Sequence, residues 1–149
     1  FENILLMKVN SIPEFLDHFN SKLLSDPSLA KVASRIVPVT STFSFPSAAE
    51  FETKAKEVIL QWLPILAGKK FYVRMHRKGL KDLIDGNEEE NHLDLIILQE
   101  LEKIGNPGKI SFEDPEAIVA VETISQQAGL SCWTRQDLEN YPWLKLNLS

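Results

Sequence analysis

Apolar residues recur every three or four positions in three segments, which predicts amphipathic helices over residues 11–25, 47–68 and 87–104. Ser11 and Ser47 stand where an N-cap is expected, and Asn87 with Glu90 can cap the third helix. Proline and glycine separate these segments from their neighbours, and Pro64 is expected to bend the last turn of the second helix. The helical part of the chain is therefore divided into three units.

Shorter apolar or β-branched runs lie before and between the helices. They predict strands over residues 4–9, 69–78, 109–112, 117–124 and 129–133, and extended chain over 32–45 with Pro38 at an edge or bend. Apolar residues alternate with mostly basic ones over residues 69–78, which places Phe71, Val73 and Met75 on the face expected to be buried. The tail around Tyr141 and Trp143 is expected to pack back as a short helix and an irregular end.

Helices alternating with strands predict an α/β fold, a layered sandwich. The first strand-helix-strand unit ends near Pro46, where we place a boundary. The prediction is a small α/β lobe over residues 1–46 and a second domain over residues 47–149.

Composition narrows the function classes. The chain has 149 residues, with 16 Lys and Arg against 21 Asp and Glu, so its formal charge of −5 argues against a generic nucleic-acid or DNA binder. Cys132, the single cysteine, excludes an intramolecular disulfide framework and fits a reducing compartment. No apolar run approaches the roughly 20 residues of a membrane span, and no charged-then-apolar leader opens the chain, so we expect no membrane partner and a cytoplasmic location.

The charge is distributed unevenly. Six of the 16 basic residues fall within residues 69–81, which contain no acid, and the rest of the chain has 10 basic and 21 acidic residues, a balance of −11. A local basic patch can attract phosphate because salt screening confines its field to about 8–10 Å. Tyr72 and His76, on the same strand face, could stack on an unpaired base. The candidate RNA-binding residues are Lys69, Lys70, Tyr72, Arg74, His76, Arg77, Lys78 and Lys81.

The alternative is a solvated strand face with no ligand, paired to the acidic residues Asp82, Asp85, Glu88, Glu89 and Glu90. The charge pattern alone fits both interpretations.

Catalytic patterns are absent from the sequence. His18, His76 and His92 have no metal-ligand spacing, and Cys132 lies in an apolar strand where a buried, inert thiol is expected. No glycine-rich phosphate loop occurs. We therefore expect no enzyme activity, no catalytic residue, no metal site and no cofactor.

Residues 47–133 resemble the THUMP domain, an RNA-binding module of tRNA-modifying enzymes. The likeness lies in the helix that ends before Gly68, the strand 70–79, the helix that ends at residues 104–105, and residues 110–124. Residues 1–46 look like the ferredoxin-like companion of that domain. The whole chain is similar to stand-alone THUMP proteins of archaea and bacteria, which lack an attached catalytic domain.

The resemblance implies recognition of tRNA, chiefly its acceptor stem and single-stranded 3′ end, in support of base modification by a partner enzyme. The alternative is a protein-interaction adaptor with little RNA affinity. Its acidic body, or an apolar tail around Tyr141, Trp143 and Leu146, would engage a tRNA-modifying enzyme.

Overall fold

A single five-stranded mixed sheet organises the protein. The computed structural model describes residues 4–32, 35–79, 83–144 and 146. In that part of the chain the strands have the order β1-β5-β4-β2-β3. β2 is parallel to β4 and to β3, whereas β5 is antiparallel to β4 and β1. The strands are β1 (Ser41–Ser44), β2 (Lys70–Lys78), β3 (Lys109–Ile110), β4 (Ala117–Ile124) and β5 (Gln127–Thr134).

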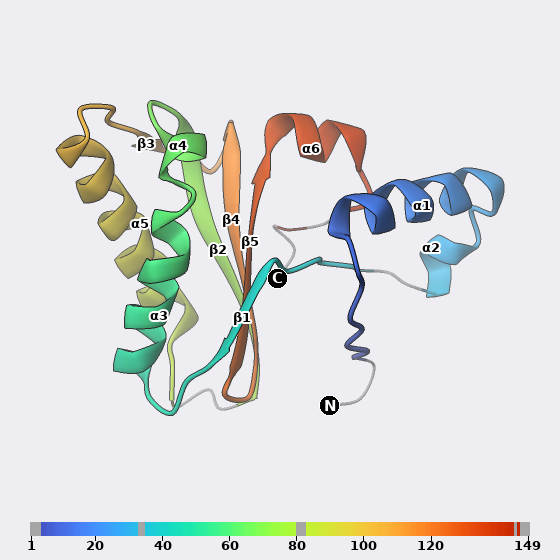
Figure 1. Ribbon diagram of the computed structural model, residues 1–149, viewed down its shortest axis with the longest axis horizontal. Helices are drawn as coiled ribbons and strands as arrows, with labels where there is room; N and C mark the ends of the chain where they lie inside the picture. The colour runs from blue at the N-terminus through green and yellow to red at the C-terminus, as the bar shows by residue number, and fades with distance from the viewer. Residues whose placement is uncertain (1–3, 33–34, 80–82, 145, 147–149) are drawn as a thin grey trace.

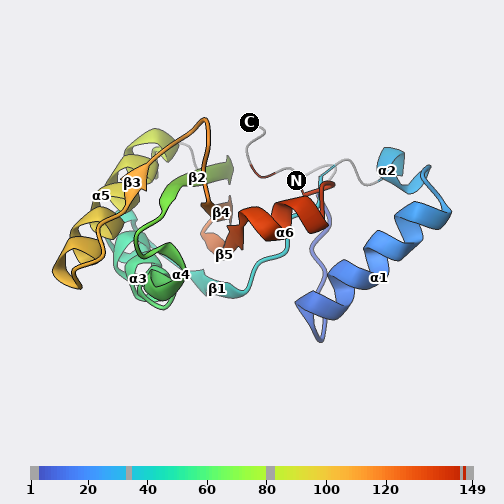
Figure 2. The same cartoon turned by 90° about the horizontal axis from the view of Figure 1, so that it is seen from above.

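The helices are divided between the two faces of the sheet (Figures 1 and 2). They are α1 (Ile12–Ser25), α2 (Leu29–Val32), α3 (Ala48–Leu60), α4 (Leu63–Leu66), α5 (Gly86–Lys103) and α6 (Arg135–Asn140). α3, α4 and α5 cover one face, and α1 and α6 lie on the other side. No helix within the described ranges is long and apolar enough to cross a membrane. The predicted α/β class is confirmed.

The larger core lies between the sheet and α3–α5. Phe71, Val73 and Met75 of β2 point into it, as their alternation predicts, and meet fully buried Leu93 and Ile97 of α5. Burial of such side chains contributes about 1.5–3 kcal/mol each before entropy is counted. This face of β2 is therefore structural. We call it the helix face, and the opposite one the outer face.

The outer face is covered by the two ends of the chain. Leu16 of α1 and Leu144 and Leu146 of the C-terminal tail are buried there with Tyr72 and Trp133. Residues 35–40 cross the sheet on the way to β1, and the side chain of Val39 lies so close to Gly129 of β5 that a Cβ there would be 2.9 Å away. Distant segments of sequence thus close the second, smaller core.

Two of the three predicted helix N-caps are confirmed. Backbone N–H groups of Glu14 and Glu50 donate to the hydroxyls of Ser11 and Ser47, as predicted. The third helix begins one residue earlier than expected, because the Asp85 carboxylate, not Asn87, accepts the N–H of Glu88 at 3.0 Å.

The strand predicted over residues 4–9 is wrong. These residues form no regular structure, and Leu5, Leu6 and Met7 are 86%, 74% and 66% exposed. An apolar run becomes a strand only where another strand accepts its hydrogen bonds, and none in the described part of the sheet pairs with it.

The sheet includes residues from both sides of the predicted boundary at residue 46. β1 precedes the boundary, yet Ser41 and Thr42 are in register with Leu130 and Gly129 of β5. The division into residues 1–46 and 47–149, with its ferredoxin-like lobe, stays a prediction.

Candidate nucleic-acid interface

β2 carries most of the predicted RNA-binding residues but divides them between two faces. Lys70, Tyr72, Arg74 and His76 alternate with the buried residues and lie on the outer face. Arg77 lies on the helix face, where its Nη1 donates to the carbonyl oxygen of Ile84, just before α5. The predicted residues therefore do not form one continuous solvent-facing stripe.

At the amino end of β2, two cations share one exposed carboxylate. Lys70 Nζ lies 2.5 Å from Asp114 Oδ2, and Arg135 Nη2 lies 2.8 Å from Asp114 Oδ1. The hydrogen bond from Lys70 and the charge of Arg135 lower the pKa of Asp114. All three side chains stay substantially exposed, so this end of β2 is accessible to a ligand.

The aromatic side chain exposed at this end is not the predicted one. Tyr72 is only 4% exposed, and burial raises the pKa of its hydroxyl. The ring of Phe112 lies 5.3 Å from that of Tyr72, is tilted by 47°, and is 67% exposed. Tyr72 is thus covered, whereas Phe112, which is not among the predicted RNA-binding residues, faces solvent.

The middle of β2 is bound by carboxylates of α5. Asp94 Oδ1 accepts the N–H of Val73 at 3.0 Å, and Glu90 Oε2 accepts that of Met75 at 2.8 Å. Glu90 also lies 3.8 Å from Arg74 Nη1. Since β3 pairs only with the first two residues of β2, these carboxylates accept the N–H groups of Val73 and Met75 where that edge has no strand partner. Burial raises the pKa of Asp94 to about 7.

Further along β2, His76 belongs to a partly buried ionic network. Its Nδ1 lies 2.8 Å from Nη2 of Arg35 and 3.3 Å from Oε2 of Glu122, and Arg35 Nη1 lies 2.6 Å from Glu122 Oε1. The His76 side chain is 15% exposed. The network fastens residues 35–40 to the sheet and leaves His76 little surface for a base.

The remaining predicted cations lie at the ends of β2. Lys69 and Lys78 are exposed, and Lys81 lies outside the described residues. β3 adds a further exposed cation, Lys109, which is in register with Lys70 and so shares its face. The amino end of β2 therefore gathers Lys69, Lys70, Lys109 and Arg135, of which the last two come from outside the basic segment. The sequence signal for Lys109 and Phe112 was only their place in the short strand predicted over 109–112.

The apolar tail proposed for a protein partner is used internally. Tyr141 Oη donates to Asp17 Oδ1 at 2.6 Å, Trp143 Nε1 donates to Asn20 Oδ1 at 3.1 Å, and Leu146 is 3% exposed. The described part of the tail, residues 141–144 and 146, thus contacts α1 and buries its leucines against the sheet.

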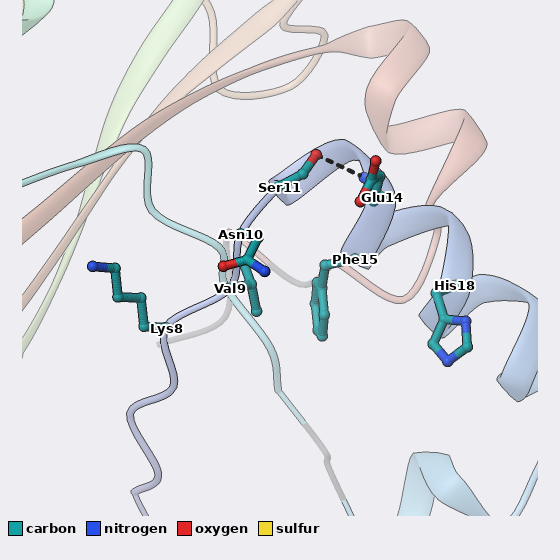
Figure 3. Close-up of a pocket in the computed structure, with 7 residues that line it drawn as sticks. All are labelled: Lys8, Val9, Asn10, Ser11, Glu14, Phe15 and His18. Atoms are coloured by element: carbon teal, nitrogen blue, oxygen red, sulfur yellow. Dashed lines mark hydrogen bonds between the residues drawn. The ribbon is translucent and has the colours of Figure 1, made fainter.

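Other features of the described residues add little to this site. A shallow hollow of about 530 Å³ lies beside the start of α1 (Figure 3), and its lining includes the Ser11–Glu14 cap together with Lys8, Val9, Asn10, Phe15 and His18. In the described ranges, no three His, Cys, Asp or Glu side chains are placed to hold a metal ion. Burial raises the pKa of Cys132 to about 12, which leaves its thiol protonated at neutral pH.

Comparison with known proteins finds likenesses to solved structures. No protein-family model matches the chain, and no curated protein matches it. The structure of TrmN from Thermus thermophilus is similar over 63% of this chain and 27% of its own, with 20% identity and a TM-score of 0.49. The structure of PH1313 from Pyrococcus horikoshii is similar over 89% of this chain and 52% of its own, with 10% identity and a TM-score of 0.45. The chain thus spans about a quarter and about half of these two proteins.

Proposed function

We propose that this protein is a non-catalytic RNA-binding protein of the cytoplasm that binds tRNA, at its acceptor stem and 3′ end, in support of base modification by another enzyme. The proposal combines the THUMP resemblance of residues 47–133 with one structural observation. In an acidic chain, exposed cations gather at the amino end of β2, where Lys69, Lys70, Lys109 and Arg135 lie on neighbouring elements.

Phosphate contacts supply affinity with little sequence discrimination, so the shape of an RNA end would supply the selectivity. The surrounding negative charge disfavours unspecific binding to duplexes elsewhere on the molecule. Such a protein binds weakly to arbitrary nucleic acid and more tightly where one RNA end fits the basic surface.

The test uses cations whose removal leaves the fold intact. Arg74 and Arg77 are unsuitable, because Arg74 pairs with Glu90 and Arg77 bonds to the Ile84 carbonyl. Lys69 and Lys109 are exposed, so their replacement by Gln should leave the thermal midpoint unchanged. The matched control replaces Lys22 and Lys31, exposed on α1 and α2.

Filter binding of tRNA over a salt series gives the readout. The wild type should lose affinity steeply with salt, and the Lys69→Gln/Lys109→Gln variant should lower the log-log slope by about one unit for each cation that contacts a phosphate. The control should bind as the wild type does. Equal slopes for all three proteins would reject this site, and no binding by the wild type would reject the function.

A further inference from the structure

We propose that Phe112 is a stacking platform for one unpaired RNA base, with Lys70, Lys109 and Arg135 placed to hold the phosphates beside it. This inference rests on the proposed function and deepens it, because it assigns the ligand at the amino end of β2 to a single-stranded RNA segment. We call Phe112 and these three cations the Phe112 platform.

The ring is exposed yet held in place. Its neighbour Tyr72 is buried and lies 5.3 Å away, so one part of the Phe112 ring packs on the protein while the ring remains 67% exposed. The backbone on either side is fixed as well, since Ser111 N–H donates to the Phe71 carbonyl at 3.0 Å and Asp114 N–H donates to the Ser111 hydroxyl at 3.2 Å. A ring fixed in this way loses little conformational entropy when a base stacks on it.

Strand pairing and the turn after Phe112 place the three cations on the elements next to this ring. Lys70 is two residues before Tyr72 on β2 and so shares its face, and Lys109 is in register with Lys70. Arg135 donates to the carbonyl oxygen of Pro115 at 3.1 Å and to the Asp114 carboxylate, which anchors it over the turn after Phe112. An exposed aromatic ring among cations is the arrangement by which proteins bind single-stranded nucleic acid.

Asp114 binds two cations of the Phe112 platform when no RNA is present. Its two carboxylate oxygens bind Lys70 and Arg135, at 2.5 and 2.8 Å, the two cations that a phosphate would need. The carboxylate therefore competes with the phosphate, and its removal should strengthen RNA binding. A purely structural role of this ion-pair network predicts no such gain.

The choice of single-stranded RNA follows from geometry. A base within a duplex has both faces covered by its neighbours, so only an unpaired or terminal base can lie on the Phe112 ring. Phosphate contacts alone would not distinguish single-stranded RNA from a duplex in this way.

The experiment compares a fluorescein-labelled single-stranded RNA of about ten nucleotides, on the scale of known single-strand sites, with a blunt duplex of the same sequence. Phe112→Ala should weaken binding of the single strand between about 5-fold and 150-fold, the range seen when a stacking ring is removed. Binding of the duplex should change much less, because only its two terminal base pairs offer an open face to the ring. Phe112→Trp should restore the affinity, and Leu95→Ala, which removes a 54% exposed side chain from α5, is the matched control.

Asp114→Asn should raise the affinity for the single strand severalfold at low salt, with the effect fading as salt rises. If the wild type binds RNA but Phe112→Ala binds the single strand equally well, the platform is rejected while the proposed function stands. If the wild type binds neither RNA, both fail. A Phe112→Ala variant that keeps RNA affinity but loses a co-purifying enzyme also overturns the inference, and points to a protein partner.

Discussion

The indole N–H of Trp143 donates to Oδ1 of Asn20 over 3.1 Å, although 123 positions separate the two residues. The Phe19 ring meets the same indole, with ring centres 4.8 Å apart. One turn of α1 is therefore held to the outer face of the sheet by the C-terminal tail, so the attachment of α1 depends on residues at the far end of the sequence.

Trp143→Phe should loosen α1 and leave the sheet unchanged. The substitution keeps an aromatic ring but removes the donor to Asn20, and such a hydrogen bond contributes about 0.5–1.5 kcal/mol. Amide hydrogens of α1 should exchange roughly 2- to 10-fold faster, whereas those of β4 keep their protection. The control is Gln127→Ala, which removes a side-chain donor to the Ser44 hydroxyl between β5 and β1 and should spare α1. Unchanged exchange in α1 would show that another contact holds it.

Gly129→Ala should destabilise the protein because the segment before β1 crosses directly above it. A Cβ at Gly129 would lie 2.9 Å from both Cγ atoms of Val39, and overpacking of this kind typically costs about 1–3 kcal/mol. Adding Val39→Ala removes those atoms. The double variant should therefore be less destabilised than the sum of the two single variants, as measured by urea unfolding. Strict additivity would mean that Val39 does not pack on this glycine in solution.

Glu89→Gln should make the protein more stable at alkaline pH. Burial and the neighbouring Glu52 raise the pKa of Glu89 to about 8, from an ordinary value of 4.5. The folded state thus favours the protonated acid, so the stability it contributes is present at low pH and is lost as pH rises toward and through 8. Gln cannot ionise and should add roughly 1–3 kcal/mol at pH 9 while changing little at pH 5.

Urea midpoints measured from pH 5 to pH 9 test this prediction. Glu88→Gln removes the exposed acid next in sequence and serves as the control, with little effect expected at either pH. A Glu89→Gln variant with the pH dependence of the wild type would place the titrating proton on another group.

Cys132 should resist alkylation in the folded protein. Burial raises the pKa of its thiol to about 12, and the thiolate is the reactive form. Iodoacetamide at pH 8 should label the native protein far more slowly than the urea-unfolded protein, as followed by mass spectrometry. Equal rates would show that β5 opens readily near Cys132.

The sequence predicts well those elements whose signals are local. The cap of α1 by Ser11, that of α3 by Ser47, and the alternation of β2 all depend on residues within a few positions of one another, and the structure has each of them. The run around Leu5 fails because a strand needs a partner, and the partner is decided by the whole fold.

In the candidate site, too, features with a local sequence signal were predictable and features set by the whole fold were not. The face of β2 that carries Lys70 was predictable from its period of two, but the cover over Tyr72 was not, because Leu16 and Leu144 reach it from opposite ends of the chain. Nor could the sequence show that Asp114 joins Lys70 to Arg135, which lie on different elements. Binding of RNA by any of these residues stays a prediction.

Synthesis of the protein imposes an order on the formation of its sheet. Thr40 donates to the carbonyl oxygen of Leu130, 90 positions later, and β1 pairs along β5 beside that bond. β1 therefore leaves the ribosome long before its partner strand exists and must wait unpaired while α3, β2 and α5 are made. The sheet can close only when β5 has emerged, so the synthesis of a strand some 90 positions downstream decides when β1 joins the sheet.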